Sequence, residues 1–360
     1  MKFFNAGAPR RATDAARLSA ANDLVHRTLA RHGLLMSDNR TRAEEPTEPF
    51  SLNDLLSGVM GPWNAPAPVP SNLPAGAEFR QETYTCASGS RRFRTYIPAA
   101  AEAGATDVVV MLHGCSQTPE DFAAGTGMNG LAEKHAFIVV YPEQSRGDNA
   151  QSCWNWFSRG DQMRGRGEPD LLAGMTAQVC AEHGVARNNT FVAGLSAGAA
   201  MAAILGETYG DVFAAVGAHS GLPSGSAKDV PSAFAAMAGS ALASPLPPVG
   251  GHRVRTIVFH GSSDNTVHPS NGHGIAQRAR RINAPQSIET SMSGHAVGRR
   301  FTREVSSGPN GAGLVEYWAI DGQGHAWSGG QPGGSYTDPK GPDASAEMVR
   351  FFFEKSHEDL

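Results

Sequence analysis

Two uninterrupted apolar runs of strand length most constrain the fold of this chain. They read DVVVML at 107–112 and FIVVY at 137–141. A strand with one face in water alternates apolar and polar residues, whereas a strand of a parallel sheet is covered on both faces and is continuously apolar. The segment RFRTYI at 92–97 does alternate, as expected of an edge strand. The two runs therefore predict a mostly parallel sheet that is covered by helices on both faces.

Helical and strand-like segments alternate through the rest of the chain. Helices are expected at 126–134, 171–182, 197–207 and 344–355, and further strands at 190–194, 214–218, 256–260 and 314–320. Strands that alternate with helices over this length indicate a doubly wound α/β fold. We assign residues 76–360 to this domain.

Residues 1–75 have a different composition, rich in charged and small residues, and contain the proline-rich run PWNAPAPVP at 62–70. We interpret them as an appendage and linker, partly disordered. Residues 12–32 have apolar positions near helical spacing, which favours a docking helix; a transit peptide or a membrane-surface anchor is the alternative. Polar residues and a proline interrupt the apolar start MKFF, so the sequence predicts no conventional secretion signal and a cytoplasmic protein.

Charge and cysteine content exclude several classes of protein. A net charge of -4 offers no basic excess for a nucleic-acid backbone. No apolar stretch approaches the roughly 18 residues of a membrane span. The four cysteines are too few for a disulfide scaffold and lack the spacing of a structural zinc site, so we expect buried free thiols and no metal. They are Cys86, Cys115, Cys153 and Cys180. The oligomeric state is left open.

The pentapeptide GLSAG at 194–198 centres on Ser196. The pattern alone is weak in a chain with 42 glycines, but TFVA precedes it as a strand and AGAAMAA follows it as a helix. In this strand-turn-helix setting, flanking glycines permit a sharp turn that lifts the serine hydroxyl above the sheet. Ser196 is therefore the candidate nucleophile. The alternative is a glycine-rich turn without chemistry.

A serine hydroxyl needs a base to take its proton and an acid to orient that base. In α/β-hydrolases both follow the serine, each at the end of a later strand. Asp264 comes after the strand at 256–259 and is the expected acid, whereas Asp321 is close enough to the base to belong to its turn. His325, in a Gly-x-Gly-His loop after the strand at 315–320, is the expected base. The remaining candidates are expected in turns, helix caps, loops or the core: Asp338, Asp343, His113, His219, His260, His268, His273 and His295.

The oxyanion that forms during acyl transfer needs two backbone N–H donors. One comes from Ala197, directly after the nucleophile. The other is expected from Cys115 in the loop LHGCSQ at 112–117, after the first apolar run. A disulfide from Cys115 to Cys153 that braces this loop is a further hypothesis, opposed to the free thiols.

Five segments together resemble the polyhydroxybutyrate depolymerase family of esterases, which also includes feruloyl and acetylxylan esterases. They are LHGCSQ at 112–117, CWNWF at 153–157, GLSAGA at 194–199, HGSSD at 260–264 and GHAW at 324–327. The resemblance implies an α/β-hydrolase fold and a triad of Ser196, Asp264 and His325 that needs no metal or organic cofactor.

The resemblance also implies a function and a binding groove. It implies ester hydrolysis through an acyl-enzyme, on poly- or oligo(3-hydroxybutyrate) or on feruloyl and acetyl sugar esters. Trp154, Trp327 and Gln117 would contact the substrate; the alternative for the two tryptophans is an ordinary place in the core. Members of the family are often extracellular and carry a further C-terminal substrate-binding domain, whereas this sequence ends soon after its last expected helix. We therefore expect a soluble oligomer, an amorphous polymer or a small acyl ester as the substrate. A non-catalytic binding protein of the same fold is the alternative from another class.

Overall fold

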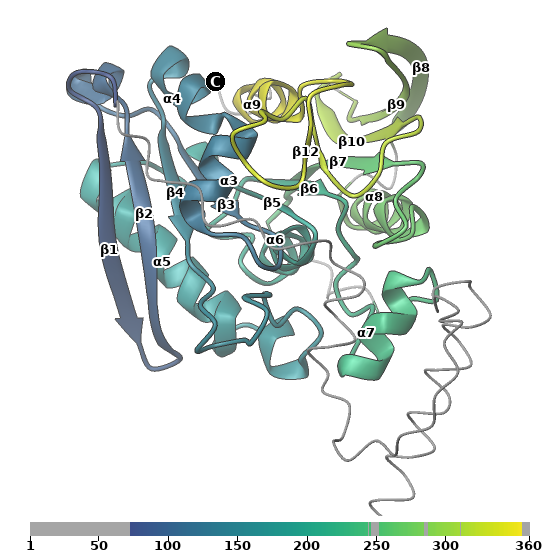
Figure 1. Ribbon diagram of the computed structural model, residues 1–360, viewed down its shortest axis with the longest axis horizontal. Coiled ribbons are helices and arrows are strands. Elements are labelled where there is room, and N and C mark those ends of the chain that lie inside the picture. The colour runs from purple at the N-terminus through teal and green to yellow at the C-terminus, as the bar shows by residue number, and fades with distance from the viewer. Residues whose placement is uncertain (1–72, 244, 246–251, 284–286, 310, 355–360) are drawn as a thin grey trace, which may run out of the picture. The chain divides into compact units, whose positions relative to one another are not determined.

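The computed structural model describes residues 73–243, 245, 252–283, 287–309 and 311–354 (Figure 1). Residues 1–72 of the expected appendage, with the helix expected at 12–32, lie outside the described residues, so the boundary at 75 stays a prediction. Within the described ranges, none of the helices has the length and apolar character that crossing a bilayer requires.

The core of the fold is a ten-stranded sheet in the order β1-β2-β4-β3-β5-β6-β7-β10-β9-β8. Its central strands pair in parallel: β4 (Ile138–Pro142), β3 (Val108–Leu112), β5 (Thr190–Leu195), β6 (Ala215–His219), β7 (Arg255–Gly261) and β10 (Gly313–Ile320). An antiparallel hairpin extends each edge, β1 (Glu78–Cys86) with β2 (Gly89–Ile97) and β8 (Ile288–Ala296) with β9 (Arg299–Ser307).

Strand β3 shows why the sheet is covered on both faces. Val108, Val110 and Leu112 belong to one buried cluster, and the alternate residues Val109 and Met111 belong to another. Successive side chains of a strand point to opposite faces, so a continuous apolar run needs a helical layer on each side. The first cluster includes residues of α5 (Gly167–His183) and α6 (Ala197–Thr208); the second includes residues of α3 (Pro119–Thr126), α4 (Met128–His135) and α9 (Ala344–Phe353) (Figure 1). The predicted α/β-hydrolase class is confirmed.

Several elements were not foreseen from the sequence. The helix expected at 126–134 is α4, whereas α3 before it was not expected; Gly127, in a left-handed conformation, separates the two helices. The sequence did not predict the hairpin β8–β9, because β8 is mostly exposed and shows no alternation of apolar and polar residues. Other elements not yet given are α7 (Val230–Met237), α8 (Ser270–Asn283), β11 (Trp327–Ser328), β12 (Thr337–Asp338) and the 3-10 turns Ala99–Ala103, Arg159–Gln162 and Arg187–Asn189.

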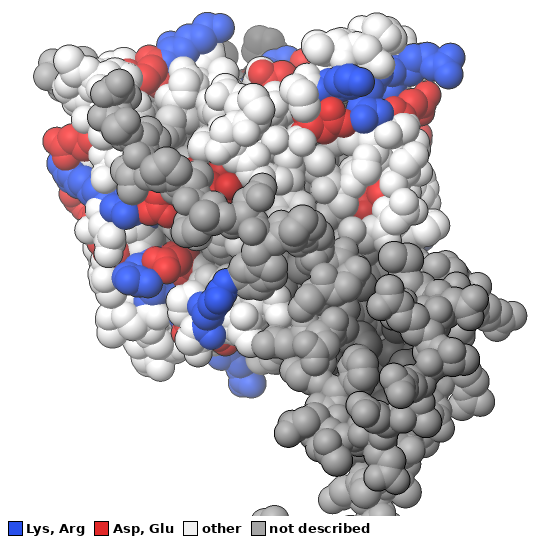
Figure 2. Space-filling view, viewed as in Figure 1, with Lys and Arg blue, Asp and Glu red and all other residues white. Residues whose placement is uncertain are grey.

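The parallel strands all end at one edge of the sheet, where ligands bind in folds of this type. The loops that leave β3, β5, β7 and β10 there carry Cys115, Ser196, Asp264 and His325. Charges do not segregate on the face shown in Figure 2, where basic and acidic side chains of the described residues lie next to one another.

Candidate active site

Ser196 occupies a sharp turn between β5 and α6. Its backbone has φ 57° and ψ −118°, outside the regions that a residue with a side chain ordinarily adopts. The turn is held because Ser196 N–H donates to the carbonyl of His219 on the neighbouring strand (2.9 Å), while the Ser196 carbonyl accepts from Ala200 (3.0 Å). Backbone strain of this kind persists only where the surroundings fix it, and it is common at active sites. The predicted turn is therefore present.

The glycines around Ser196 let backbones approach closely. A Cβ atom on Gly198 would lie 2.1 Å from the Leu112 carbonyl oxygen and 2.6 Å from that of His113, and one on Gly194 would lie 2.4 Å from the Gly198 carbonyl carbon. All of these contacts are with backbone atoms, which cannot rotate away as a flexible side chain can. The first turn of α6 thus packs directly on the loop that follows β3.

Gly198→Ala is expected to destabilise the protein by about 3 kcal/mol or more, because the methyl group has to displace the loop after β3. Gly130→Ala is the matched control: it lies within α4 with nothing within 4 Å of its Cβ position, so its stability should stay equal or rise slightly. Urea unfolding of both variants measures the difference. Equal unfolding midpoints for the two variants would contradict the close packing.

Asp264 and His325 are in contact although they lie 61 positions apart in the sequence. His325 Nδ1 donates to Asp264 Oδ2 at 2.7 Å, and the other carboxylate oxygen accepts from the backbone N–H groups of Thr266 (2.9 Å) and Val267 (2.8 Å). Burial alone would raise the pKa of Asp264, but hydrogen bonds from His260 and His325 hold it well below its usual range. An ionised Asp264 keeps the proton of neutral His325 on Nδ1, which leaves Nε2 free to act as a base.

His219 connects the serine turn with the loop of the base. Its carbonyl accepts from Ser196, and its Nε2 accepts from the backbone N–H of Ser328 (3.0 Å), three residues after His325. Burial lowers the pKa of His219 to about 3, so the ring is neutral. His219 is thus a hydrogen-bonded core histidine, as the sequence predicted. With the other described residues, Ser196 forms hydrogen bonds through its backbone N–H and carbonyl. That its hydroxyl approaches His325 is part of the mechanism proposed below.

The loop after β3 presents Cys115 beside the turn. Ala197 is the first residue of α6, so its N–H has no acceptor within the helix. Gly114 N–H is already taken by the side chain of Gln117 (2.9 Å). His113 is buried; burial lowers its pKa to about 4, and its Nε2 accepts from the Gln144 N–H (3.1 Å). The Cys115 and Ala197 amides therefore stay the candidates for the oxyanion donors.

The expectation of four free thiols is wrong for two of them. Cys115 and Cys153 form a disulfide, whereas Cys86 and Cys180 are free and half-buried. The alternative hypothesis, a disulfide between Cys115 and Cys153, is confirmed. Sequence spacing could not decide between this pair and free thiols, because the two residues are 38 positions apart and are brought together only by the fold.

The structure corrects the three residues assigned to substrate contact. Trp154 is 0% exposed and its Nε1–H donates to the His113 carbonyl (3.0 Å); Trp327 is 1% exposed and donates to Ser345 Oγ (3.0 Å). Gln117 is 3% exposed and uses both ends of its amide within the protein. None of these side chains presents a surface to a ligand, so they support the loops of the site from behind.

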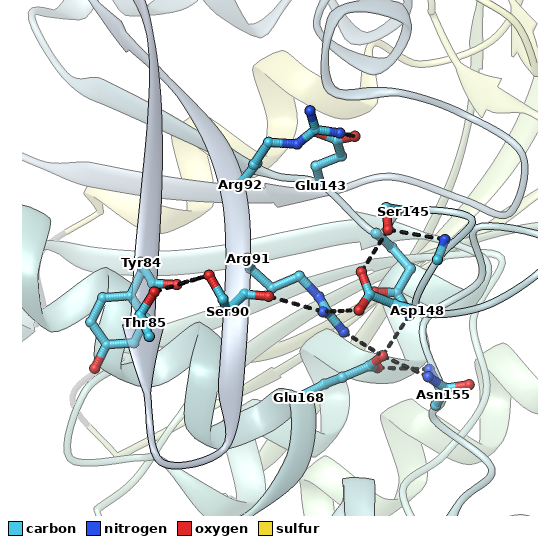
Figure 3. A network of polar contacts seen from close by, with 12 residues as sticks. Tyr84, Thr85, Ser90, Arg91, Arg92, Glu143, Ser145, Asp148, Asn155 and Glu168 are labelled. Carbon is cyan, nitrogen blue, oxygen red and sulfur yellow. Dashed lines mark hydrogen bonds and ion pairs between the residues drawn. The ribbon is translucent and has the colours of Figure 1, made fainter.

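A buried carboxylate fixes the segment that carries Cys153. Glu168 accepts from the Asn155 backbone N–H (2.7 Å), the Asn155 side chain (2.7 Å) and the Gln144 side chain (2.6 Å). Figure 3 shows Arg91 between Glu168 (3.4 Å) and Asp148 (2.6 Å). Burial raises the pKa of Glu168 to about 7, while the Asn155 hydrogen bonds and the Arg91 charge act in the opposite direction. Gln144 links this network to His113, because its backbone N–H donates to His113 Nε2. The network therefore holds both segments that the disulfide joins, the one with Cys153 and the one with Cys115.

The described part of the chain offers no metal centre. Among the described residues, no group of three or more histidine, cysteine, aspartate or glutamate side chains is arranged to hold a metal ion. A polar pocket of about 300 Å³ lies beside the network of Figure 3. It is lined by Ser90, Arg91, Arg92, Glu143, Ser145 and Asp148.

Comparison with known proteins shows a family of esterases to which this chain is similar. Residues 92–296 match the family model described as esterase PHB depolymerase. The chain is 33% identical over 250 residues to poly(3-hydroxyalkanoate) depolymerase C of Paucimonas lemoignei. This match covers 66% of the chain and 58% of the relative. It is 30% identical over 205 residues to probable acetylxylan esterase A of Aspergillus clavatus, covering 51% of this chain and 66% of the relative. The chain thus spans about three fifths of the length of these relatives.

Solved structures support the fold. The acetyl xylan esterase from Aspergillus awamori superimposes with a TM-score of 0.61 at 19% identity, covering 76% of this chain and 98% of the other.

Proposed function

Because the chain belongs to the PHB depolymerase family of esterases, we propose that it is a serine esterase that hydrolyses carboxylic esters through an acyl-enzyme. The observation that carries the proposal is the Asp264–His325 hydrogen bond on the strand edge that also carries the strained turn of Ser196. A serine hydroxyl, an imidazole as base and a carboxylate that orients the imidazole through its Nδ1 are the parts that nucleophilic catalysis by a hydroxyl requires.

In the proposed mechanism, Ser196 Oγ attacks the ester carbonyl while His325 Nε2 takes its proton. Asp264 keeps the imidazole oriented and stabilises its positive charge. The backbone N–H groups of Cys115 and Ala197 donate to the oxyanion of the tetrahedral intermediate. His325 then protonates the departing alcohol, and water, activated by the same imidazole, releases the acid and regenerates Ser196.

Two substrate classes are proposed, each from a relative. The likeness to a poly(3-hydroxyalkanoate) depolymerase favours oligomers or polymers of 3-hydroxybutyrate. The likeness to acetylxylan esterases favours acyl esters of sugars as the second candidate. The fold is common to both.

Fluorophosphonate labelling together with a substrate panel tests the proposal. We expect the probe to modify the peptide that contains Ser196, and the protein to hydrolyse at least one of 3-hydroxybutyrate oligomers, acetylated xylan fragments and feruloyl sugars. The preferred substrate distinguishes the two classes. Absence of labelling and of hydrolysis on the whole panel would support a non-catalytic binding protein instead.

A further inference from the structure

Tyr336 has an unusual backbone conformation for a large side chain. It lies in the loop between β11 and β12 and has φ 52°. A bulky residue in this left-handed region is a strained outlier that costs about 1–3 kcal/mol. Such a residue persists only where neighbouring contacts hold it, so the contacts around Tyr336 indicate what the strain serves.

Hydrogen bonds fix the backbone on both sides of Tyr336. The preceding residue, Ser335, donates through its N–H to Asp121 Oδ1 (2.9 Å) and through its hydroxyl to Asp121 Oδ2 (2.6 Å). Its carbonyl accepts from Gln117 Nε2 (3.1 Å), and the Tyr336 carbonyl accepts from the Trp327 N–H (2.7 Å). Gln117 and Asp121 thus act on Tyr336 from the oxyanion loop and α3.

These contacts bring the phenol to the oxyanion loop. Tyr336 Oη lies 3.3 Å from Ser116 Oγ, next to Cys115, and Ser116 also has a positive φ of 63°. The Ser116 hydroxyl donates to the Cys115 carbonyl at 2.6 Å, so its single hydrogen is used. Tyr336 is therefore the donor of the pair, at a separation well above the usual 2.7–2.8 Å of such bonds.

Other tyrosine hydroxyls of the fold are engaged more firmly. Tyr96 donates to Glu133 at 2.6 Å, Tyr141 to Asn129 at 2.7 Å and Tyr209 to Asp170 at 3.0 Å. Tyr336 is half-buried and holds its hydroxyl against a weak neutral partner. A substrate oxygen can replace that partner without leaving a buried charge unpaired.

We infer that Tyr336 is a specificity-determining residue whose hydroxyl donates a hydrogen bond to a second oxygen of the ester substrate, beside the oxyanion donor Cys115. The inference rests on the proposed esterase function and deepens it. The ligand chemistry is a neutral hydroxyl, carbonyl or ether oxygen a few bonds from the scissile carbonyl. That oxygen has two sources, the acyl side in a 3-hydroxyacyl ester and the alcohol side in an ester of a polyol.

Three esters that differ by one hydroxyl test the inference: ethyl butyrate, ethyl 3-hydroxybutyrate and 2-hydroxyethyl butyrate. We expect Tyr336→Phe to lower kcat/KM about tenfold on one or both hydroxylated esters and by less than about twofold on ethyl butyrate. The hydroxylated ester that is affected identifies the side of the substrate. Tyr84→Phe, in a half-buried tyrosine of edge strand β1, is the matched control and should leave all three values unchanged.

The outcomes separate the inference from the proposed function. An equal loss of Tyr336→Phe on all three esters would show that Tyr336 only supports the loop, and no loss on any would show that its hydroxyl is unused; either result overturns the inference. Ethyl butyrate also reports whether the variant has folded. A wild-type protein that hydrolyses none of the three, and is not labelled at Ser196, would contradict the esterase function itself.

Discussion

Replacement of Ser196 by alanine is expected to lower kcat for ester hydrolysis by about 10⁴-fold or more. The change removes only the attacking oxygen, whereas the Cys115 and Ala197 amides stay in place to give the residual rate. Ser196 is 8% exposed and its backbone contacts do not involve the hydroxyl, so the folded state should survive. The measurement is kcat on the best ester of the panel, together with the unfolding midpoint.

Ser220→Ala is the control for this prediction. Ser220 is a buried serine with φ 52° at the end of the neighbouring strand β6, and its hydroxyl lies 3.2 Å from His219 Nδ1. Losing that contact should cost less than about tenfold in rate. A Ser196→Ala protein that kept wild-type turnover would remove Ser196 from the mechanism, and the fluorophosphonate-labelled residue would then identify the nucleophile.

Asp264→Asn is expected to lower kcat by about 10³- to 10⁴-fold with little change in fold. The amide oxygen can keep the two backbone N–H groups of Thr266 and Val267, which turns the amide nitrogen toward His325. That nitrogen donates, so His325 Nδ1 has to accept and its proton moves to Nε2. The imidazole then offers a hydrogen, not a lone pair, toward Ser196.

Asp321→Asn decides between the two acids considered from the sequence. The Asp321 side chain is 58% exposed and 3.6 Å from Arg300, a surface pair that contributes little to stability. The kcat of the Asp321→Asn variant for ester hydrolysis should stay within about twofold of the wild-type value. A large loss in Asp321→Asn with a small one in Asp264→Asn would reverse the assignment of the acid.

Local sequence predicted the features that depend on which faces of a segment are buried. The runs at 107–112 and 137–141 became β3 and β4, fully buried and parallel. Ser196, Asp264 and His325 each follow one of the expected parallel strands, which predicted that they lie at one sheet edge, because parallel strands end together. His325 and Asp264 are indeed hydrogen-bonded, while their catalytic roles stay a prediction.

The tertiary structure alone decided the contacts between segments distant in the chain. It paired Cys115 with Cys153, withdrew Trp154 and Trp327 from any surface, and turned Gln117 into a brace for the loop of Tyr336. The local sequence around an aromatic residue does not show whether its side chain lines a groove or packs in the core. Which of the two environments it has depends on the residues that pack against it. Those residues lie in loops, and the conformation of a loop cannot be predicted from hydrophobic periodicity. Hydrophobic patterning therefore determined the sheet and its functional edge, and only packing and hydrogen bonding across that edge determined which side chains are presented there.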